Sequence, residues 1–214
     1  MTHKTASKFF LLPFVSRSSL QHLFNQKERD IILGSDQEEE EEESKDEQDE
    51  NSPLFPDLMA HISPILIQTL ASNIQFLLTN IYSMRVVEQV IKSSSSTDSD
   101  NNSSCSLLVG GLVDVVVDKF DDGTDICDDK LGHLMIRRLI SSSSSFASQL
   151  VSSLTTSCSN ERKVELISSN RRCFVMVSLA QTNLKQIKEL FKSVNLREND
   201  HNKKGIEVLR DTLK

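Results

Sequence analysis

The sequence predicts an all-α fold in which paired helices stack into an α-solenoid. Apolar residues recur with a helical period along much of the chain, for example at Leu184, Ile187, Leu190 and Val194, with lysines between them. One short motif recurs four times, at intervals of 49, 41 and 32 residues, and each interval holds one further helical segment. Paired helices in units of about 35–45 residues are typical of solenoid proteins.

Composition divides the chain into unlike parts. Of its 214 residues 37% are hydrophobic and 5% aromatic, and the net charge is −7. Residues 36–50 hold eleven acids and one lysine, whereas residues 160–214 hold twelve Lys/Arg and seven Asp/Glu, a net charge of +5. Nucleic-acid binding by the basic part stays open, because phosphate binding depends on local charge. No run of about 18 apolar residues occurs, so no membrane span or membrane partner is predicted.

A low-complexity stretch separates two expected structural parts. Residues 34–52 predict an acidic disordered insertion, because like charges repel one another. Residues 1–33 are expected to be the tail of a helical repeat, and residues 53–214 to form a helical-repeat domain. Residues 1–27 hold serines and basic residues but no acid, which also suits a transit peptide.

Three segments inside the second part carry local predictions. Residues 58–79 are expected to form two short helices with a break at Pro64, because proline fits the first turn of a helix. Residues 93–104 are rich in Ser, Asp and Asn and predict a disordered loop. Residues 107–120 are ambiguous, because the Val-rich run suits a strand and Gly110-Gly111 weakens a helix.

The repeated motif has three parts. Each copy begins with Asn or Asp, has a small residue three positions later, and has an apolar pair at positions +6 and +7. We expect the first residue to cap a helix, the small residue to admit a neighbouring helix, and the pair to be buried. The alternative is a set of unrelated helices that align by chance. The copies begin at Asn80, Asp129, Asn170 and Asn202, and a weaker fifth copy begins at His3.

These motifs resemble those of a known family. Residues 129–140 (DKLGHLMIRRLI) resemble the second helix of a Puf (pumilio) repeat. The chain departs from the family at Ser83 and Cys173, where glycine is common, and in a shorter stretch after Ile140. Met1 falls inside a repeat, so we expect a truncated product or a short isoform. Four segments in order resemble the CPL region of the Penguin branch of pumilio-like proteins, namely 62–70, 132–140, 170–179 and 204–213. A Puf-like segment at residues 4–33 precedes them.

The resemblance implies an armadillo-like, pumilio-type α-solenoid of the nucleus and nucleolus. It implies binding of ribosomal RNA or mRNA with little sequence preference, in large-subunit ribosome biogenesis and translation regulation, with pre-ribosomal proteins as further partners. The alternative function is a protein-interaction module that binds no RNA itself. Classical Puf repeats read one base with three side chains. Here only Arg85 with Glu88 resembles a stacking residue and an edge reader, and Met, Phe and Ile in the other triplet positions cannot supply the missing hydrogen bonds, so we expect no base code. The triplets are 84/85/88, 133/134/137, 174/175/178 and 206/207/210.

Backbone binding requires only cations on a shared face. Cations stand next to the expected helix caps in three of the copies, which predicts a stripe along one edge of the array. The alternative is that they are ordinary solubilising residues. The candidate nucleic-acid-binding residues are Lys130, His133, Arg137, Arg138, Arg171, Arg172, Lys203 and Lys204.

Enzymatic and cofactor motifs are not found in the sequence. It has no Gly-rich phosphate loop, nucleophile elbow or zinc-protease helix, so we expect no enzyme activity, no cofactor and no small-molecule substrate. Residues 118–129 resemble a calcium loop, but Phe120 stands where a ligand is needed. The four cysteines form no Cys-x-x-Cys pair, which argues against zinc, and we expect reduced thiols in an intracellular protein.

Overall fold

The computed structural model describes residues 22–33, 55–94, 102–120 and 122–214, together with six single positions before residue 22. Within this part the chain forms ten helices and no β-strand, which confirms the predicted all-α class. The acidic insertion predicted at 34–52 and the motif copy at His3 lie outside the described residues.

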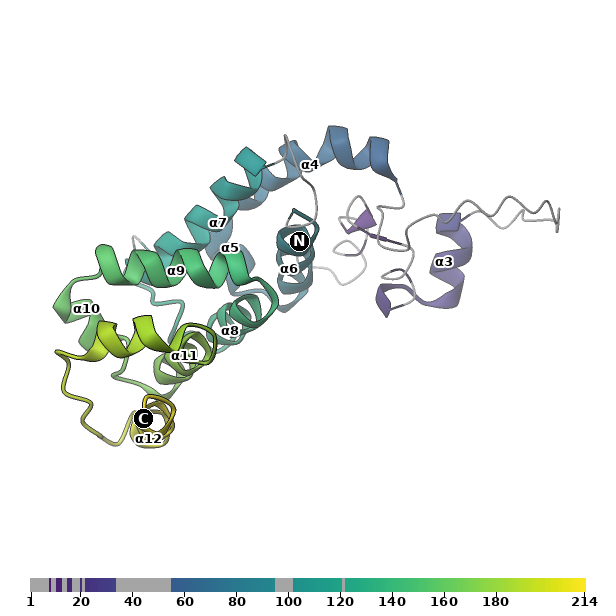
Figure 1. Cartoon of the computed structure of the whole chain (residues 1–214). Coiled ribbons are helices and arrows are strands. Elements are labelled where there is room, and N and C mark those ends of the chain that lie inside the picture. The colour runs from purple at the N-terminus through teal and green to yellow at the C-terminus, as the bar shows by residue number, and fades with distance from the viewer. Residues whose placement is uncertain are drawn as a thin grey trace.

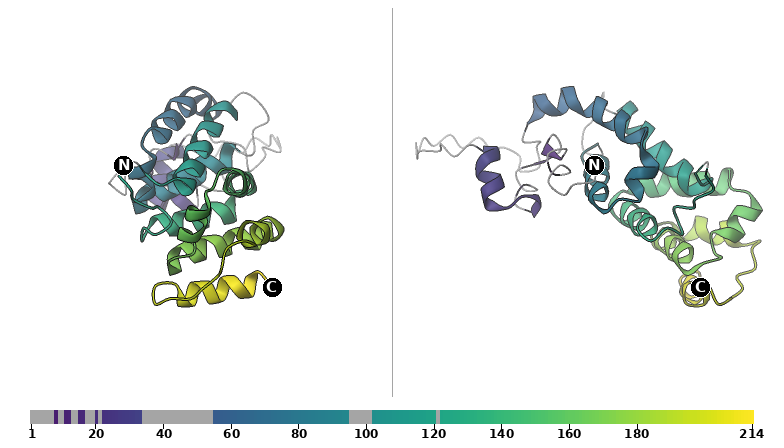
Figure 2. Two further views of the ribbon diagram at one scale, coloured as in Figure 1. Left: turned by 90° about the vertical axis from the view of Figure 1, so that its left-hand side faces the viewer. Right: turned by 180° about the vertical axis from the view of Figure 1, so that it is seen from behind.

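Most helices form two rows that pack on each other. In the first row α4, α7 and α9 lie side by side, and in the second row α6, α8, α11 and α12 follow one another. Figure 1 shows the first-row helices lengthwise and the second-row helices nearly end on, so the rows cross steeply. In both views of Figure 2, α4 lies at one end of the rows and α12 at the other. The first row comprises α4 (Pro56–Ala71), α7 (Asn102–Val117) and α9 (Ser144–Thr156), and the second α6 (Ile81–Ser94), α8 (Gly132–Ser142), α11 (Asn170–Phe191) and α12 (Lys203–Thr212). Three shorter helices are α3 (Gln26–Leu33), α5 (Ile74–Leu78) and α10 (Asn160–Glu165).

The four described motif copies coincide with the four second-row helices. The small residue of each copy is buried. A Cβ added to Gly205 would lie 2.6 Å from the Cβ of Cys173, the small residue of the preceding copy. The small residues of the last two copies therefore stack and admit the close helix contact that was predicted. Gly132 instead faces Ile126 of the preceding connection, whose Cδ1 would overlap an added Cβ. The apolar pairs are buried except for Val208, which is half-buried.

The predicted caps are correct in the first two copies. The Oδ1 atom of Asn80 accepts the N–H of Tyr82 at 2.9 Å at the start of α6. Asp129 Oδ1 accepts the N–H groups of Leu131 and Gly132 at 2.8 and 2.7 Å. Both side chains satisfy N–H groups that a helix start leaves without partners.

The predicted caps are wrong in the last two copies, because both side chains bond to other segments instead. Helix α11 is capped by Ser169, whose Oγ accepts the N–H of the third residue along. The side chain of Asn170 accepts the N–H of Gly205 at 2.6 Å. Asn202 is buried and donates from Nδ2 to the carbonyl oxygen of Ile167 at 2.7 Å. Sequence spacing could not distinguish a cap from a bond to a neighbouring helix.

The break predicted at Pro64 is wrong. Helix α4 continues through Pro64 to Ala71, and the chain turns at residues 72–73 before α5 begins. A proline inside a helix removes one backbone hydrogen bond and crowds the preceding turn. Buried Ile67 and Leu70, which follow Pro64, extend the packed face of α4 and offset that cost.

Residues 102–117 form helix α7, so the strand alternative is excluded. A Cβ on Gly111 would lie 2.5 Å from Cδ1 of Ile74, so this glycine admits α5 against α7. Helix α6 reaches Ser94 and α7 begins at Asn102, so both ends of the segment predicted as a loop, 93–104, are helical. Residues 95–101 lie outside the described part.

Helix α11 bends sharply at Asn183. The backbone angles there are φ −138° and ψ 49°, which lie outside the helical region. In Figure 1 the first part of α11 is seen end on, and the part after the bend lies across the view. Ile187, Leu190 and Phe191 are buried in this second part, as the predicted helical stripe requires. The stripe is wrong at its two ends, because Leu184 is 41% exposed and Val194 lies beyond the end of α11.

A buried ion pair fixes the long connection between α7 and α8. Arg162 is 7% exposed, and its Nη1 lies 2.6 Å from Oδ2 of Asp125. Its Nε and Nη2 donate to the carbonyl oxygens of Val117 and Val116, both at 2.9 Å, at the end of α7. Burial by itself raises the pKa of Asp125, but the hydrogen bond and charge of Arg162, with the charge of Arg172, outweigh burial and hold that pKa below its ordinary value.

Candidate nucleic-acid interface

Neighbouring second-row helices begin along one edge of the row. Ser169, which caps α11, donates from Oγ to Oδ1 of Asp128, just before α8, at 2.6 Å. Gly205, in the first turn of α12, bonds to Asn170 at the start of α11. The helices α8, α11 and α12 therefore run parallel, start beside start. We call this surface the N-terminal edge, comprising residues 128–133, 169–172 and 201–205.

Six of the eight predicted residues lie on the N-terminal edge. Lys203 and Lys204 begin α12 and Lys130 precedes α8; all three are exposed, and none forms an ion pair with a carboxylate of the described residues. Arg171 is also exposed and donates from Nη1 to the carbonyl oxygen of Asp128 at 2.8 Å, which leaves its charge uncompensated. The positive ends of the helix dipoles add positive potential along the same edge.

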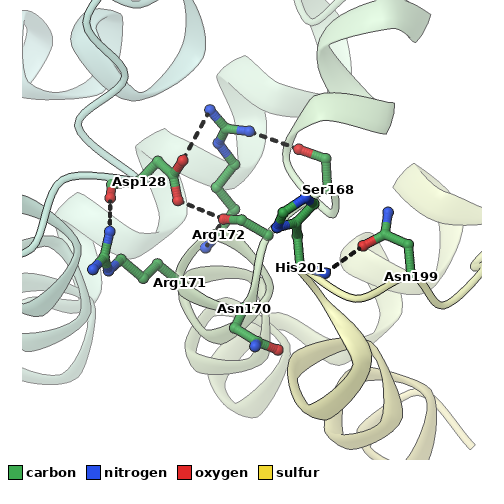
Figure 3. Close-up of a pocket in the computed structure, with 8 residues that line it drawn as sticks. Asp128, Ser168, Asn170, Arg171, Arg172, Asn199 and His201 are labelled. Atoms are coloured by element: carbon green, nitrogen blue, oxygen red, sulfur yellow. Dashed lines mark hydrogen bonds and ion pairs between the residues drawn. The ribbon is translucent and has the colours of Figure 1, made fainter.

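A polar cleft of about 670 Å³ lies at the start of α11. Figure 3 shows Arg171 and Arg172 both bonded to Asp128, while His201 and Asn199 come from the loop before α12. The cleft joins the starts of two helices into one polar surface. Its lining comprises Asp128, Ser168, Ser169, Asn170, Arg171, Arg172, Asn199 and His201.

Two of the predicted cations are paired with carboxylates inside the protein. The Nε atom of Arg172 lies 2.9 Å from Oδ2 of Asp125, and its Nη2 lies 3.5 Å from Oδ2 of Asp128. Arg138 pairs through Nε with the buried carboxylate of Glu88 on α6. Their charges are offset locally, so they attract an external anion less than the unpaired lysines do.

Two further predicted residues, Arg137 and His133, lie on α8 and contact uncharged groups. Arg137 reaches α11, where its guanidinium carbon lies 5.5 Å from the centre of the Phe174 ring and its Nε donates to Oγ of Ser178 at 3.2 Å. The Nδ1 atom of His133 lies 2.8 Å from the carbonyl oxygen of Asp129. This contact holds the imidazole against the start of its own helix.

Several side chains at the base-reading positions are unavailable to a base. Val175 and Ile206 are fully buried. Glu88 is 7% exposed and pairs with Arg138. These three side chains therefore cannot read base edges, which is consistent with the absence of a code in the sequence.

Sequence reasoning missed the carboxylates that pair with the predicted cations. Asp125 and Asp128 were considered only as part of a calcium loop, and Glu88 only as a base reader. Each lies 44 to 50 residues from its arginine along the chain. The acid-rich connection between α7 and α8 was the available signal for Asp125 and Asp128, but nothing in the sequence showed which arginine each acid would meet.

No metal or membrane element is found in the described part of the chain. There, no group of three or more His, Cys, Asp or Glu side chains is placed to hold a metal ion. None of the helices so described combines the length and apolarity that crossing a bilayer requires. Burial raises the pKa of the Cys127 and Cys173 thiols to about 12.

Comparison with known proteins identifies the family. A protein-family model described as the CPL (NUC119) domain matches residues 3–149, more than half of the chain. The chain belongs to the CPL (NUC119) domain family. The CPL domain is a non-catalytic domain associated with RNA binding, and it is found in pumilio-like nucleolar RNA-binding proteins. No curated protein and no solved structure matches the chain significantly.

The CPL match confirms the predicted CPL resemblance, and its range differs from the expected parts of the chain. It includes residues before position 33 and ends within α9. Helices α11 and α12 follow the matched range, and they carry Arg171, Arg172, Lys203 and Lys204. The part boundaries at 33 and 53 stay predictions.

Proposed function

We propose that this CPL-domain chain is an RNA-binding protein of the nucleolar pumilio-like type, from the Penguin branch, that holds the phosphate backbone with little sequence preference. In this proposal the helices form an armadillo-like α-solenoid. The chain acts in large-subunit ribosome biogenesis and translation regulation, bound to ribosomal RNA or mRNA and to pre-ribosomal proteins. Family membership supports the RNA association, and the two rows of helices support the solenoid.

One observation carries the RNA proposal: uncompensated cations gather where three parallel helices begin. Lys203 and Lys204 occupy adjacent exposed positions, with Arg171 on the next helix and Lys130 before the one after that. The spacing between helices distributes these charges along the N-terminal edge. An RNA strand lying along that edge would meet cations without base contacts, which is how phosphates are held independently of sequence.

The number of cations sets the expected salt dependence. Single-stranded nucleic acid loses about 0.7 in log K per decade of salt for each phosphate neutralised. If Lys130, Arg171, Lys203 and Lys204 each neutralise one phosphate, the plot of log K against log salt has a slope of about −3.

Charge reversal on the edge tests the proposal. The variant Lys203→Glu/Lys204→Glu is compared with Lys185→Glu/Lys192→Glu, which changes net charge equally on exposed positions late in α11. Fluorescence anisotropy with labelled single-stranded RNA across a salt series gives affinity and slope. We expect the edge variant to bind more weakly and its slope to become shallower by about 1.4, with a smaller effect for the control. Equal weakening by both variants, or by neither, would contradict binding at this edge.

The alternative of a protein-interaction module is favoured by apolar side chains on the first row. Ile65 on α4 is 68% exposed and Leu107 on the adjacent α7 is 58% exposed. Two large apolar side chains exposed on adjacent helices are the observation that favours this alternative. If the wild-type chain binds no RNA even at low salt, this alternative replaces the RNA proposal.

A further inference from the structure

Arg137 is a cation of the second row that an aromatic ring and a hydroxyl group orient. It leaves α8 and lies on the Phe174 ring of α11 at 5.5 Å, within the range of a cation–π contact. Its Nε donates to Ser178, whose own hydroxyl donates to the carbonyl oxygen of Phe174 at 3.0 Å. The aromatic ring and the hydroxyl together fix the plane of the guanidinium.

The charge of Arg137 is not offset by a carboxylate within the described part of the chain. No carboxylate there forms an ion pair with it, and neither Nη atom donates to a described residue. The adjacent Arg138 differs, because it pairs with Glu88. One turn before Arg137 on the same helix, Leu134 is 45% exposed and adds an apolar border.

We infer that Arg137, held on Phe174 and bordered by Leu134, forms a stacking platform for one unpaired RNA base. This inference rests on the proposed RNA-binding function. Phosphate binding through charge alone requires no fixed plane, and an exposed lysine also supplies the charge, as a point charge. A guanidinium plane bordered by an apolar side chain matches the flat face of a base. Every base has such a face, so this contact adds affinity without sequence preference.

The position of the platform supports this role. Arg137 lies about one turn beyond the N-terminal edge along α8, so a backbone held at the edge can direct a base inward over the row. Base faces are hidden within a duplex. The platform therefore accepts a base only from single-stranded RNA.

The variant Arg137→Lys tests the platform, because it keeps the charge and removes the plane. Affinity is measured by anisotropy for three probes: a short oligouridine, a strand of the same length with abasic sites, and a duplex. We expect at least about five-fold weaker binding of the oligouridine and less than two-fold change for the other two probes. The salt slope for oligouridine stays unchanged, because the charge is retained.

Two further variants keep the result interpretable. Arg138→Lys, a matched substitution at the next residue, is expected to change no affinity by more than about two-fold. Phe174→Leu keeps apolar bulk but removes the ring under the guanidinium, so it should show the same selective loss. Circular dichroism checks that each variant is folded.

The outcomes separate the platform from the function on which it rests. Equal weakening of all three probes, or no weakening, overturns the platform while salt-dependent binding at the N-terminal edge stands. Absence of binding by the wild-type chain to any probe at low salt overturns both. Selective loss for the oligouridine alone supports the platform.

Discussion

Replacing Asp125 by asparagine should destabilise the fold strongly. The substitution keeps the size of the side chain but removes the carboxylate that lies 2.6 Å from Arg162 and 2.9 Å from Arg172. The side chain of Arg162 is 8% exposed, so water cannot replace the lost partner. Removing one partner of a buried ion pair costs about 3–5 kcal/mol, because the buried charge that remains loses its main partner. Among the carboxylates of the described residues, Arg162 keeps only the partly exposed Glu165, whose Oε2 lies 3.1 Å from its Nη1.

For a chain of this size the loss corresponds to a fall in Tm of roughly 6–20 °C. Urea unfolding followed by circular dichroism at neutral pH measures the free energy of unfolding. The matched control is Glu189→Gln, which breaks the pair between Lys192 and Glu189, whose side chains are 74% and 71% exposed. That exposed pair should contribute at most about 1 kcal/mol. If Asp125→Asn costs no more than the control, the buried pair does not anchor the connection between α7 and α8.

The same variant carries a prediction about pH. The folded-state pKa of Asp125 lies below its ordinary value of 3.8, so the folded state favours the ionised carboxylate. Its contribution is therefore fully present above the unfolded-state pKa and is lost as pH falls through the folded-state pKa. Wild type should lose its advantage over Asp125→Asn as the solution is acidified below about pH 4. A constant difference between the two proteins across that range would refute the assignment.

Two other predictions concern packing and thiol reactivity. Gly205→Ala should lower the free energy of unfolding by about 1–3 kcal/mol, because the added Cβ would lie 2.6 Å from Cys173 and 3.0 Å from the backbone of Asn170. Urea unfolding measures this loss, and an unchanged stability would show that α11 and α12 separate freely. Cys127 and Cys173, both with pKa raised to about 12 by burial, should react slowly with a thiol reagent at pH 8 and rapidly after denaturation. Mass mapping of the labelled sites reports this, and rapid labelling of either native thiol would contradict the burial.

The motif predicted the second-row helices correctly because each of its requirements involves residues that are close together in the sequence. A small residue and an apolar pair at helical spacing can be read from neighbouring positions, and all four copies led to helices. Helix ends were harder to predict, since Pro64 resembles a first-turn proline and Asn170 resembles a cap. In the folded chain, the packed face of α4 keeps the helix continuous through Pro64, and the N–H of Gly205 takes the side chain of Asn170 as its acceptor.

The candidate interface was predictable only in part, for the same reason. Exposure of Lys203 and Lys204 follows from their place on the helix, and it agrees with the predicted stripe. The pairing of Arg172 with Asp125 and of Arg138 with Glu88 depends on segments that only the folded chain brings together. Which cations keep their charge for a ligand is therefore a tertiary property.

The bend at Asn183 limits where the array can accept extra sequence. Each residue inserted into the helical turn between Asn183 and Ile187 would rotate the segment that follows by about 100° and turn Ile187 and Leu190 from the interior toward water. Lengthening the connection between α6 and α7 leaves the buried face of both helices unchanged. Extra residues are thus tolerated between successive helices, and the helical turns of α11 on either side of its bend offer no such place.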